Sequence, residues 1–261
     1  MATLRRPAVA GLFYPEGASE LRAMVQSLLT DAHTDGPCPK AIIAPHAGYI
    51  YSGAVAASVY TRLQPYAHLI TRVVLLGPSH RVALRGLAAP SVDVFSTPLG
   101  TIPVDHAALR LIADLPFVCT SDQAHAQEHS LEVQLPFLQA ILANFSVIPL
   151  VVGEAAPHEV AQVLERLWGG DETLIVISSD LSHYHDYATA QRLDAATSQA
   201  IELLRFEDLD YDSACGRNPV SGLLYVARQR GLHAHAIDVR NSGDTAGPRD
   251  QVVGYGAYVI N

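Results

Sequence analysis

The chain lacks the features that mark several large classes of protein. It has no CxxC pair, and its three cysteines are too few for a disulfide framework, which favours a reducing compartment. No run of Lys or Arg exists to neutralise phosphates and the formal net charge is −9, so we expect no nucleic-acid partner. No apolar stretch approaches the roughly 18 residues that a membrane-spanning helix needs, so we expect no membrane association.

Motifs of several enzyme classes are also missing. The sequence contains no GxGxxG or P-loop motif for nucleotide phosphates, no HExxH metalloprotease motif and no GxSxG nucleophile elbow. Residues 1–7 lack the apolar core of a signal peptide. We therefore expect a soluble, cytoplasmic protein that is not a serine hydrolase.

What is present indicates one α/β domain over residues 1–261. Hydrophobic residues make up 49% of the chain and charged residues 16%, which is typical of a globular protein with a large core. Apolar runs alternate with amphipathic stretches, which predicts a central mixed or mostly parallel sheet flanked by helices. The expected helices span residues 19–30, 52–63, 130–144, 157–168, 188–204 and 219–230. Further expected strands span residues 147–152, 232–239 and 251–260, with a turn or hairpin at 95–103.

Four apolar runs lead into polar residues that are able to bind a metal ion. The first two runs end at His46 and His80, a third leads to Asp180 and His183, and a fourth leads to Asp244. Because ligands in open α/β sheets lie beyond the carboxyl ends of the strands, we expect these side chains to converge. Two imidazoles and a carboxylate form the ligand set of many non-haem Fe(II) centres.

Each of these residues also has a purely structural interpretation. A histidine at the position of His46 or His80 can cap a helix or donate to a backbone carbonyl. Asp180 is suited to a helix N-cap, which would leave His183 an ordinary surface residue. Asp244 lies in a turn-rich loop of the kind that is usually just solvated. The metal-binding and proton-transfer roles are therefore hypotheses.

Two further segments leave alternatives open. Glu128 and Glu132 flank the start of a predicted helix, where the positive end of the helix dipole would stabilise them. His129 would project from the same helix start, where it could also reach a ligand. Cys215 precedes another predicted helix, whose N-terminus would lower the thiol pKa and yield a nucleophile; inert packing is the alternative.

Several collinear segments together resemble the Memo family, whose bacterial and archaeal members are called AmmeMemoRadiSam system protein B. The resemblance spans nearly the whole chain. The segments that carry it are RPAVAGLFYP (6–15), APHAGYIYSG (44–53), LGPSH (76–80), EHSLEVQLPF (128–137), SSDLSH (178–183), CGRNP (215–219) and VVGYG (252–256). The family is similar in fold to class III extradiol dioxygenases, whose iron is held by two histidines and a carboxylate.

The resemblance implies a metal site at His46 and His80. Animal members of the family place a cysteine as the third ligand, in a loop that aligns with residues 241–244, where this chain has Asp244. That change implies a harder ligand set, which favours Fe(II), with copper or zinc as alternatives. Three residues match pocket residues of the family, which implies roles in orienting ligands or moving protons: Asp180, His129 and His183.

Three activities are compatible with these residues. The leading hypothesis is a metal-dependent oxidoreductase of the dioxygenase type, acting on an unknown substrate. The alternatives are a binding module that holds a small-molecule or phosphopeptide ligand without turnover, and a metal-dependent hydrolase. The family name also implies a radical-SAM partner protein.

Overall fold

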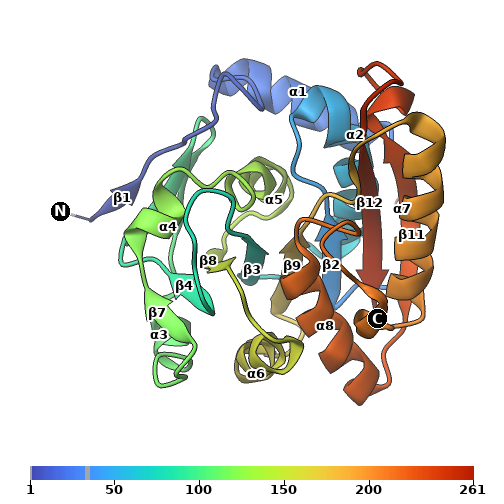
Figure 1. The fold of residues 1–261 in the computed structure, drawn as a ribbon. Helices are drawn as coiled ribbons and strands as arrows, with labels where there is room; N and C mark the ends of the chain where they lie inside the picture. The colour runs from blue at the N-terminus through green and yellow to red at the C-terminus, as the bar shows by residue number, and fades with distance from the viewer. Residues whose placement is uncertain (1, 33–35) are drawn as a thin grey trace.

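A mixed sheet of nine strands runs through the centre of the molecule (Figure 1). The computed structural model describes residues 2–32 and 36–261. The strands of this sheet are β2 (Ala41–Ala44), β3 (Arg72–Pro78), β4 (Leu87–Ala89), β7 (Val118–Thr120), β8 (Ser146–Val152), β9 (Thr173–Ser178), β10 (His183–His185), β11 (Ala234–Asn241) and β12 (Val252–Ile260). Their order is β10-β12-β2-β9-β3-β8-β4-β7, and β11 pairs with the other strands through β12.

Four parallel strands, β2, β9, β3 and β8, form the middle of the sheet. Every residue of β2 and β9 is buried, and all are small, apolar or hydroxyl-bearing. Strands covered on both faces need apolar side chains on both faces, which explains the continuous apolar runs in the sequence. Because β12 is antiparallel to β2 and β4 is antiparallel to β8, the sheet is mixed, as predicted.

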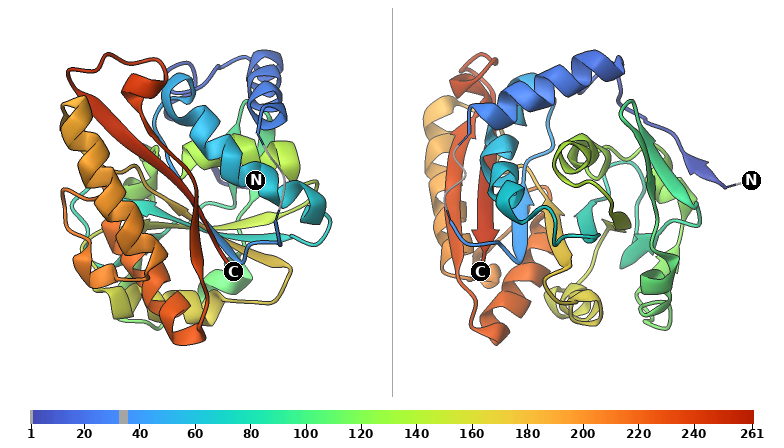
Figure 2. Two further views of the ribbon diagram at one scale, coloured as in Figure 1. Left: turned by 90° about the vertical axis from the view of Figure 1, so that its right-hand side faces the viewer. Right: turned by 180° about the vertical axis from the view of Figure 1, so that it is seen from behind.

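Helices cover both faces of this sheet (Figure 2). The longer ones are α1 (Ala18–Thr30), α2 (Tyr49–Tyr60), α5 (Leu135–Ile141), α6 (Pro157–Leu167), α7 (Tyr187–Glu202) and α8 (Arg217–Arg230). On one face α2 and α5 pack with α1 outside them, and on the other α6 packs against α8 while α7 lies over β11 and β12. None of the described helices combines the length and the apolar character needed to cross a membrane.

The predicted helices and strands agree with these elements, apart from the helix predicted at residues 130–144. That segment is divided into a 3-10 turn, η2 (Glu132–Gln134), and the shorter helix α5. Pro136 has no N–H to donate, so it is tolerated in the first turn of α5 but not in the middle of a longer helix. The division places the polar side chains of residues 128–134 against the ends of the central strands.

A smaller sheet lies beside the main one. It consists of β1 (Leu4–Arg5), β5 (Val94–Thr97) and β6 (Gly100–Pro103), in the order β1-β5-β6. The antiparallel pairing of β5 with β6 confirms the hairpin predicted at residues 95–103. The remaining short elements are α3 (His106–Arg110), α4 (Asp122–Ala126), η1 (Thr61–Tyr66), η3 (Phe206–Asp208) and η4 (Ser242–Asp244).

A buried ion pair holds the N-terminal segment to the domain. The guanidinium of Arg5 in β1 contacts the carboxylate of Glu132, and both side chains are buried. That carboxylate also accepts hydrogen bonds from the backbone N–H groups of Ala8 and Val9, at 2.7 and 3.0 Å, and from the Tyr14 hydroxyl at 2.6 Å. These donors together compensate for the hydration that the two charges lose. Glu132 therefore anchors the N-terminal segment rather than stabilising a helix end.

Replacing Glu132 by Gln should lower the free energy of unfolding by about 3–5 kcal/mol, because the Arg5 charge would stay buried without its counter-ion. Urea denaturation followed by circular dichroism measures this loss. The exposed ion pair between Arg228 and Glu207 is the matched control, and Glu207→Gln should leave the free energy of unfolding close to that of the unmodified protein. Similar losses in both variants would contradict the anchoring role.

A buried histidine makes stability depend on pH. His125 lies in α4, with Nε2 2.9 Å from the carbonyl oxygen of Ala88 in β4. Burial lowers the pKa of His125 from 6.5 to about 4. Because the folded state prefers the neutral ring, protonation favours the unfolded chain. The stability contributed by this ring is therefore complete above pH 6.5 and is lost as the pH falls toward 4.

We expect the free energy of unfolding to fall by on the order of 3 kcal/mol from His125 alone between pH 6.5 and 4. The variant His125→Gln keeps a donor for Ala88 and does not titrate, so its stability should decline less steeply over the same range. Urea denaturation at a series of pH values measures both curves. Parallel curves for the variant and the unmodified protein would show that another group causes the acid sensitivity.

Candidate metal centre

Three neighbouring parallel strands bring polar side chains to one edge of the sheet. The strands β2, β9 and β3 lie side by side, and their carboxyl ends lead to His46, Asp180 and His80. The convergence predicted for these three residues is confirmed. The backbone N–H of His46 donates to the Asp180 carboxylate at 2.7 Å, and the centroids of the His46 and His80 rings are 5.2 Å apart.

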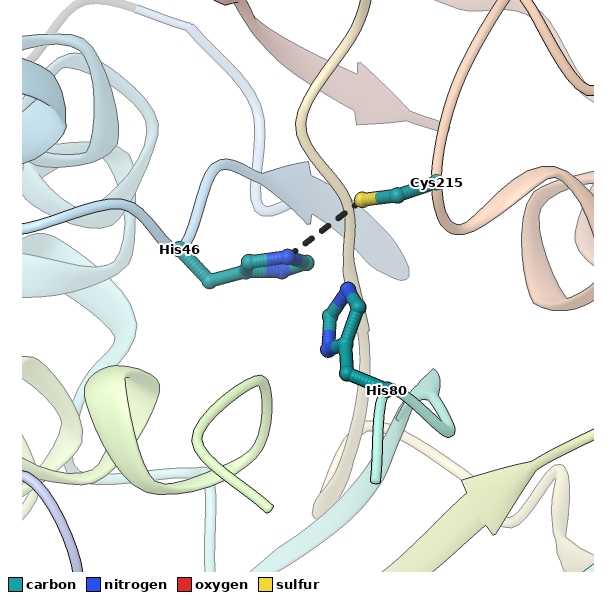
Figure 3. A group of neighbouring side chains, drawn as sticks. All are labelled: His46, His80 and Cys215. Atoms are coloured by element: carbon teal, nitrogen blue, oxygen red, sulfur yellow. Dashed lines mark hydrogen bonds between the residues drawn. The ribbon is translucent and has the colours of Figure 1, made fainter. Parts of the chain in front are cut away.

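The side chain next to the two imidazoles is Cys215 (Figure 3). One donor atom from each of His46, His80 and Cys215 lies within 4.8 Å of the other two. The Cys215 sulfur is 3.3 Å from Nε2 of His46. The loop before α8 reaches this position because Gly216 has no side chain: a Cβ there would lie 2.6 Å from Cβ of Ser179. Two nitrogens and a sulfur at this spacing are a ligand set for a transition metal.

Asp244 does not join this cluster, and the predicted set of two histidines and Asp244 is corrected here. Its carboxylate accepts hydrogen bonds from the Tyr187 hydroxyl and from the backbone N–H of Asn241, and so closes the turn η4. It lines a separate cavity of about 370 Å³ beside α7 and β11. Ser242 of the same turn lines the cavity in front of the histidines, whereas Asp244 lines the cavity beside α7 and β11. The two hydrogen bonds hold the Asp244 carboxylate there, away from the histidines.

Glu128 orients His80. Its carboxylate accepts the backbone N–H of His80 at 2.6 Å and lies 2.8 Å from Nδ1 of the same residue. Burial opposes the ionisation of Glu128, but the hydrogen bond and charge of His80 outweigh it and lower the pKa to about 2. An ionised carboxylate only accepts, so Nδ1 of His80 carries a proton, and in the neutral form of the ring Nε2 presents a lone pair. Glu128 thus positions His80 instead of stabilising a helix end.

Burial keeps both His46 and Cys215 uncharged. Burial lowers the pKa of His46 well below its usual value, and the neighbouring histidines lower it further. Burial also raises the pKa of the Cys215 thiol, and the charge of Asp180 adds to this effect. The low thiol pKa considered from the sequence is therefore contradicted, because desolvation outweighs the nearby helix N-terminus. A bound cation would reverse this balance, since it stabilises the thiolate directly.

Asp180, His129 and His183 line the same pocket as the cluster. Burial raises the pKa of Asp180 to about 7, and the hydrogen bond from the backbone of His46 only partly offsets this. Burial lowers the pKa of His129 to about 4, and its ring stacks on that of His80 with the centroids 4.6 Å apart. Burial likewise lowers the pKa of His183. The three residues are in place for proton transfer, and that role stays a prediction.

A cavity of about 690 Å³ opens in front of these residues. Its walls are rich in aromatic side chains, from Phe13, Tyr51, Tyr184, Tyr211 and Tyr255. Tyr184 has a φ of 61°, in the left-handed region that a bulky residue rarely adopts. Strained backbone conformations are often found at functional sites, and Tyr184 lines the wall of this pocket.

Sequence reasoning missed three parts of this site. Glu128 and Ser178, whose Oγ is 2.9 Å from Nδ1 of His46, lie in motifs with an unusual density of polar residues, and that density is the available signal. Cys215 was considered as a separate nucleophile, because nothing local in the sequence connects its loop with the ends of β2 and β3. The aromatic walls come from segments far apart in the chain and have no common motif.

The whole chain is similar to proteins already known. A family model described as "Memo-like protein" matches residues 5–259. A MEMO1 family protein of Aquifex aeolicus is 38% identical over 264 residues, which cover 97% of each chain. A MEMO1 family protein of Aeropyrum pernix is 37% identical and is matched over 98% of this chain and 99% of its own.

Solved structures include chains with a related fold. The uncharacterized protein JW3007 from Escherichia coli K12 superposes with a TM-score of 0.56 at 14% identity, over 84% of this chain and 98% of that one. At this identity the likeness concerns the fold alone. The family match and the relatives, by contrast, extend along almost the full sequence, and they show that this chain belongs to the Memo-like family.

Proposed function

We propose that this protein is a metal-dependent oxidoreductase whose ion is held by His46, His80 and Cys215. One donor atom from each of the three side chains lies within 4.8 Å of the donor atoms of the other two, and all three residues line one pocket. This geometry is the main support for the proposal. The pairing of His80 with Glu128 supports it, because histidines that bind metals usually donate their second nitrogen to a carboxylate or carbonyl.

The donor set fits a transition metal better than a hard cation. Imidazole nitrogen suits iron, copper and zinc, and a thiolate favours these ions over Mg²⁺ or Ca²⁺. Sulfur in place of the carboxylate of Asp244 makes the set softer, so copper becomes as suitable as the Fe(II) expected from the sequence, and zinc also fits. A redox-active ion bound here would supply a Lewis acid and an electron donor or acceptor at the floor of the pocket.

The protein's own side chains around the cluster would manage protons and water. Asp180, with a pKa of about 7, is able both to give and to accept a proton near neutral pH. His129 is uncharged at that pH, so its ring is available to hydrogen-bond with a ligand instead of repelling the cation. The aromatic walls would exclude water from a bound ligand, which strengthens every electrostatic contact inside.

The pocket walls favour an anionic ligand with a flat apolar body. Arg81 is exposed on the wall, and it is the only Lys or Arg among the described lining residues. The aromatic rings offer surfaces for a flat group, and a volume of about 690 Å³ is typical of a small-molecule site. The same features favour the second candidate function, a module that binds such an anion without turnover. The radical-SAM partner implied by the family resemblance remains a prediction.

Cobalt(II) titration under argon tests the ligand set. We expect a near-ultraviolet sulfur-to-metal charge-transfer band in the unmodified protein. Cys215→Ala should lose this band. Its affinity for Co(II) should fall by at least roughly 10–100-fold, which is the loss caused by removing a residue that only orients a metal ligand. Asp244→Ala is the control and should keep both the band and the affinity. Loss of affinity in Asp244→Ala with Cys215→Ala unchanged would restore the ligand set expected from the sequence.

Calorimetric titration of the metal-free protein with benzoate, phenyl phosphate and benzamide tests the ligand chemistry of the pocket walls, because no ion is then present to bind the anions. The two anions should bind more tightly than the neutral amide, by about tenfold for one partly exposed charge pair. Arg81→Gln should remove this preference, whereas Arg85→Gln, an exposed arginine outside this pocket, should keep it. Equal binding of benzoate and benzamide to the unmodified protein would contradict an anionic ligand.

Oxygen uptake separates the two candidate functions. Fe(II)-loaded or copper-loaded protein should consume O₂ in the presence of an aromatic anion that binds, and the metal-free protein should not. Binding of the same anion to metal-free protein, without uptake in the loaded form, would favour the binding module.

A further inference from the structure

Buried polar side chains form a chain of hydrogen bonds that ends at His46. Tyr60 in α2, Gln134 in η2 and Ser178 at the end of β9 are all fully buried, as is the ring of His46. The Tyr60 hydroxyl is 2.8 Å from Oε1 of Gln134, and Nε2 of Gln134 is 2.8 Å from Oγ of Ser178. That hydroxyl oxygen is in turn 2.9 Å from Nδ1 of His46. In such a network each donor must face an acceptor, so the proton positions are deduced by counting.

The carbonyl oxygen of Pro45 sets the orientation of the Gln134 amide. It lies 2.9 Å from Nε2 of Gln134. A carbonyl only accepts, so the amide nitrogen must face it, and the reversed amide would bring two oxygens together. The Tyr60 hydroxyl therefore donates to Oε1, and the second amide hydrogen of Gln134 is directed to Ser178.

The carbonyl oxygen of Ser130 takes the single hydroxyl proton of Ser178. The two oxygens are 2.6 Å apart, a separation that requires a proton between them. With this proton committed, the Ser178 oxygen acts only as an acceptor toward its other two neighbours, Gln134 and His46. The group that donates from His46 is therefore Nδ1–H.

We propose that this relay holds His46 in the tautomer that carries its proton on Nδ1, and that Ser178 and Gln134 are positioning residues for a metal ligand. The other ring nitrogen, Nε2, then keeps its lone pair and accepts from the Cys215 thiol at 3.3 Å. A free imidazole side chain in water favours the opposite tautomer, so the relay selects the less common form. The consequence for metal binding rests on the proposed function, whereas the tautomer itself does not.

One short segment thereby prepares both histidines. Ser130 and Gln134 act on His46 through Ser178, and Glu128 acts on His80 directly. In each ring the segment occupies Nδ1 and leaves Nε2 with a lone pair. The polar density of residues 128–134 is explained in this way, since their side chains and carbonyls set the protonation of two ligands from different strands.

Nuclear magnetic resonance of metal-free protein labelled with ¹⁵N-histidine tests the tautomer. At mildly alkaline pH, long-range ¹H–¹⁵N correlations distinguish a protonated ring nitrogen from one with a lone pair, and the variant His46→Gln assigns the signals. We expect His46 to show a protonated Nδ1 and an unprotonated Nε2. A protonated Nε2 in the unmodified protein would overturn the proposal without any variant being made.

Ser178→Ala tests the relay, because it removes the acceptor for Nδ1–H. We expect the His46 signals to move toward the Nε2–H form, together with a loss of roughly 10–100-fold in Co(II) affinity. Ser182→Ala is the matched control: this buried serine lies beside Asp194, which accepts from its backbone N–H at 3.0 Å, so both readouts should stay unchanged. An unchanged tautomer in Ser178→Ala would overturn the relay.

A second variant covers the case in which Ser178→Ala does not fold. Gln134→Leu keeps the size of the side chain but removes one of the two donors to Ser178, and we expect a smaller shift of the His46 signals in the same direction. An unchanged spectrum would argue against a role for Gln134. If Co(II) does not bind the unmodified protein, the proposed function fails, while the tautomer measured without metal still decides the present inference.

Discussion

Glu128, Glu132 and Gln134 lie within one short segment and are all buried, and each would cost several kcal/mol without partners. A different part of the chain satisfies each of them. His80 donates to Glu128, Arg5 and the N-terminal segment donate to Glu132, and Gln134 donates to Pro45 and Ser178. The need to satisfy these side chains holds the N-terminal segment and the ends of three central strands, β2, β9 and β3, close together. The candidate metal centre lies where these segments meet.

The electrostatics of the site follow from this burial. Desolvation keeps the His46 ring and the Cys215 thiol neutral and raises the pKa of Asp180 to about 7, whereas Glu128 stays ionised because His80 donates to it. A cation would be held in such a site mainly through lone pairs. A divalent ion that displaced the thiol proton would add one net positive charge instead of two.

The two histidines, Asp244 and Cys215 show how much of the site the sequence predicts. His46 and His80 each end an apolar run, and β2 and β3, the parallel strands on either side of β9, bring these ends to one edge of the sheet. Asp244 also follows an apolar run, but the Tyr187 hydroxyl and the Asn241 N–H hold its carboxylate in the turn η4, beside a different cavity. Cys215 follows no strand of the sheet, and its position depends on how the loop before α8 packs against Ser179.

The sequence by itself determined the α/β alternation, most of the helices and strands, and the two histidines at strand ends. These features are local: apolar periodicity and the residue that ends a run are written within a few positions. Only the tertiary structure decided the order of the strands, the exclusion of Asp244 and the arrival of Cys215. It also decided the proton arrangement that we propose for His46, because the Ser178 hydroxyl meets Ser130, Gln134 and His46 only after distant segments pack together. Contacts between such segments follow from the packing of the whole chain, and no local pattern records them.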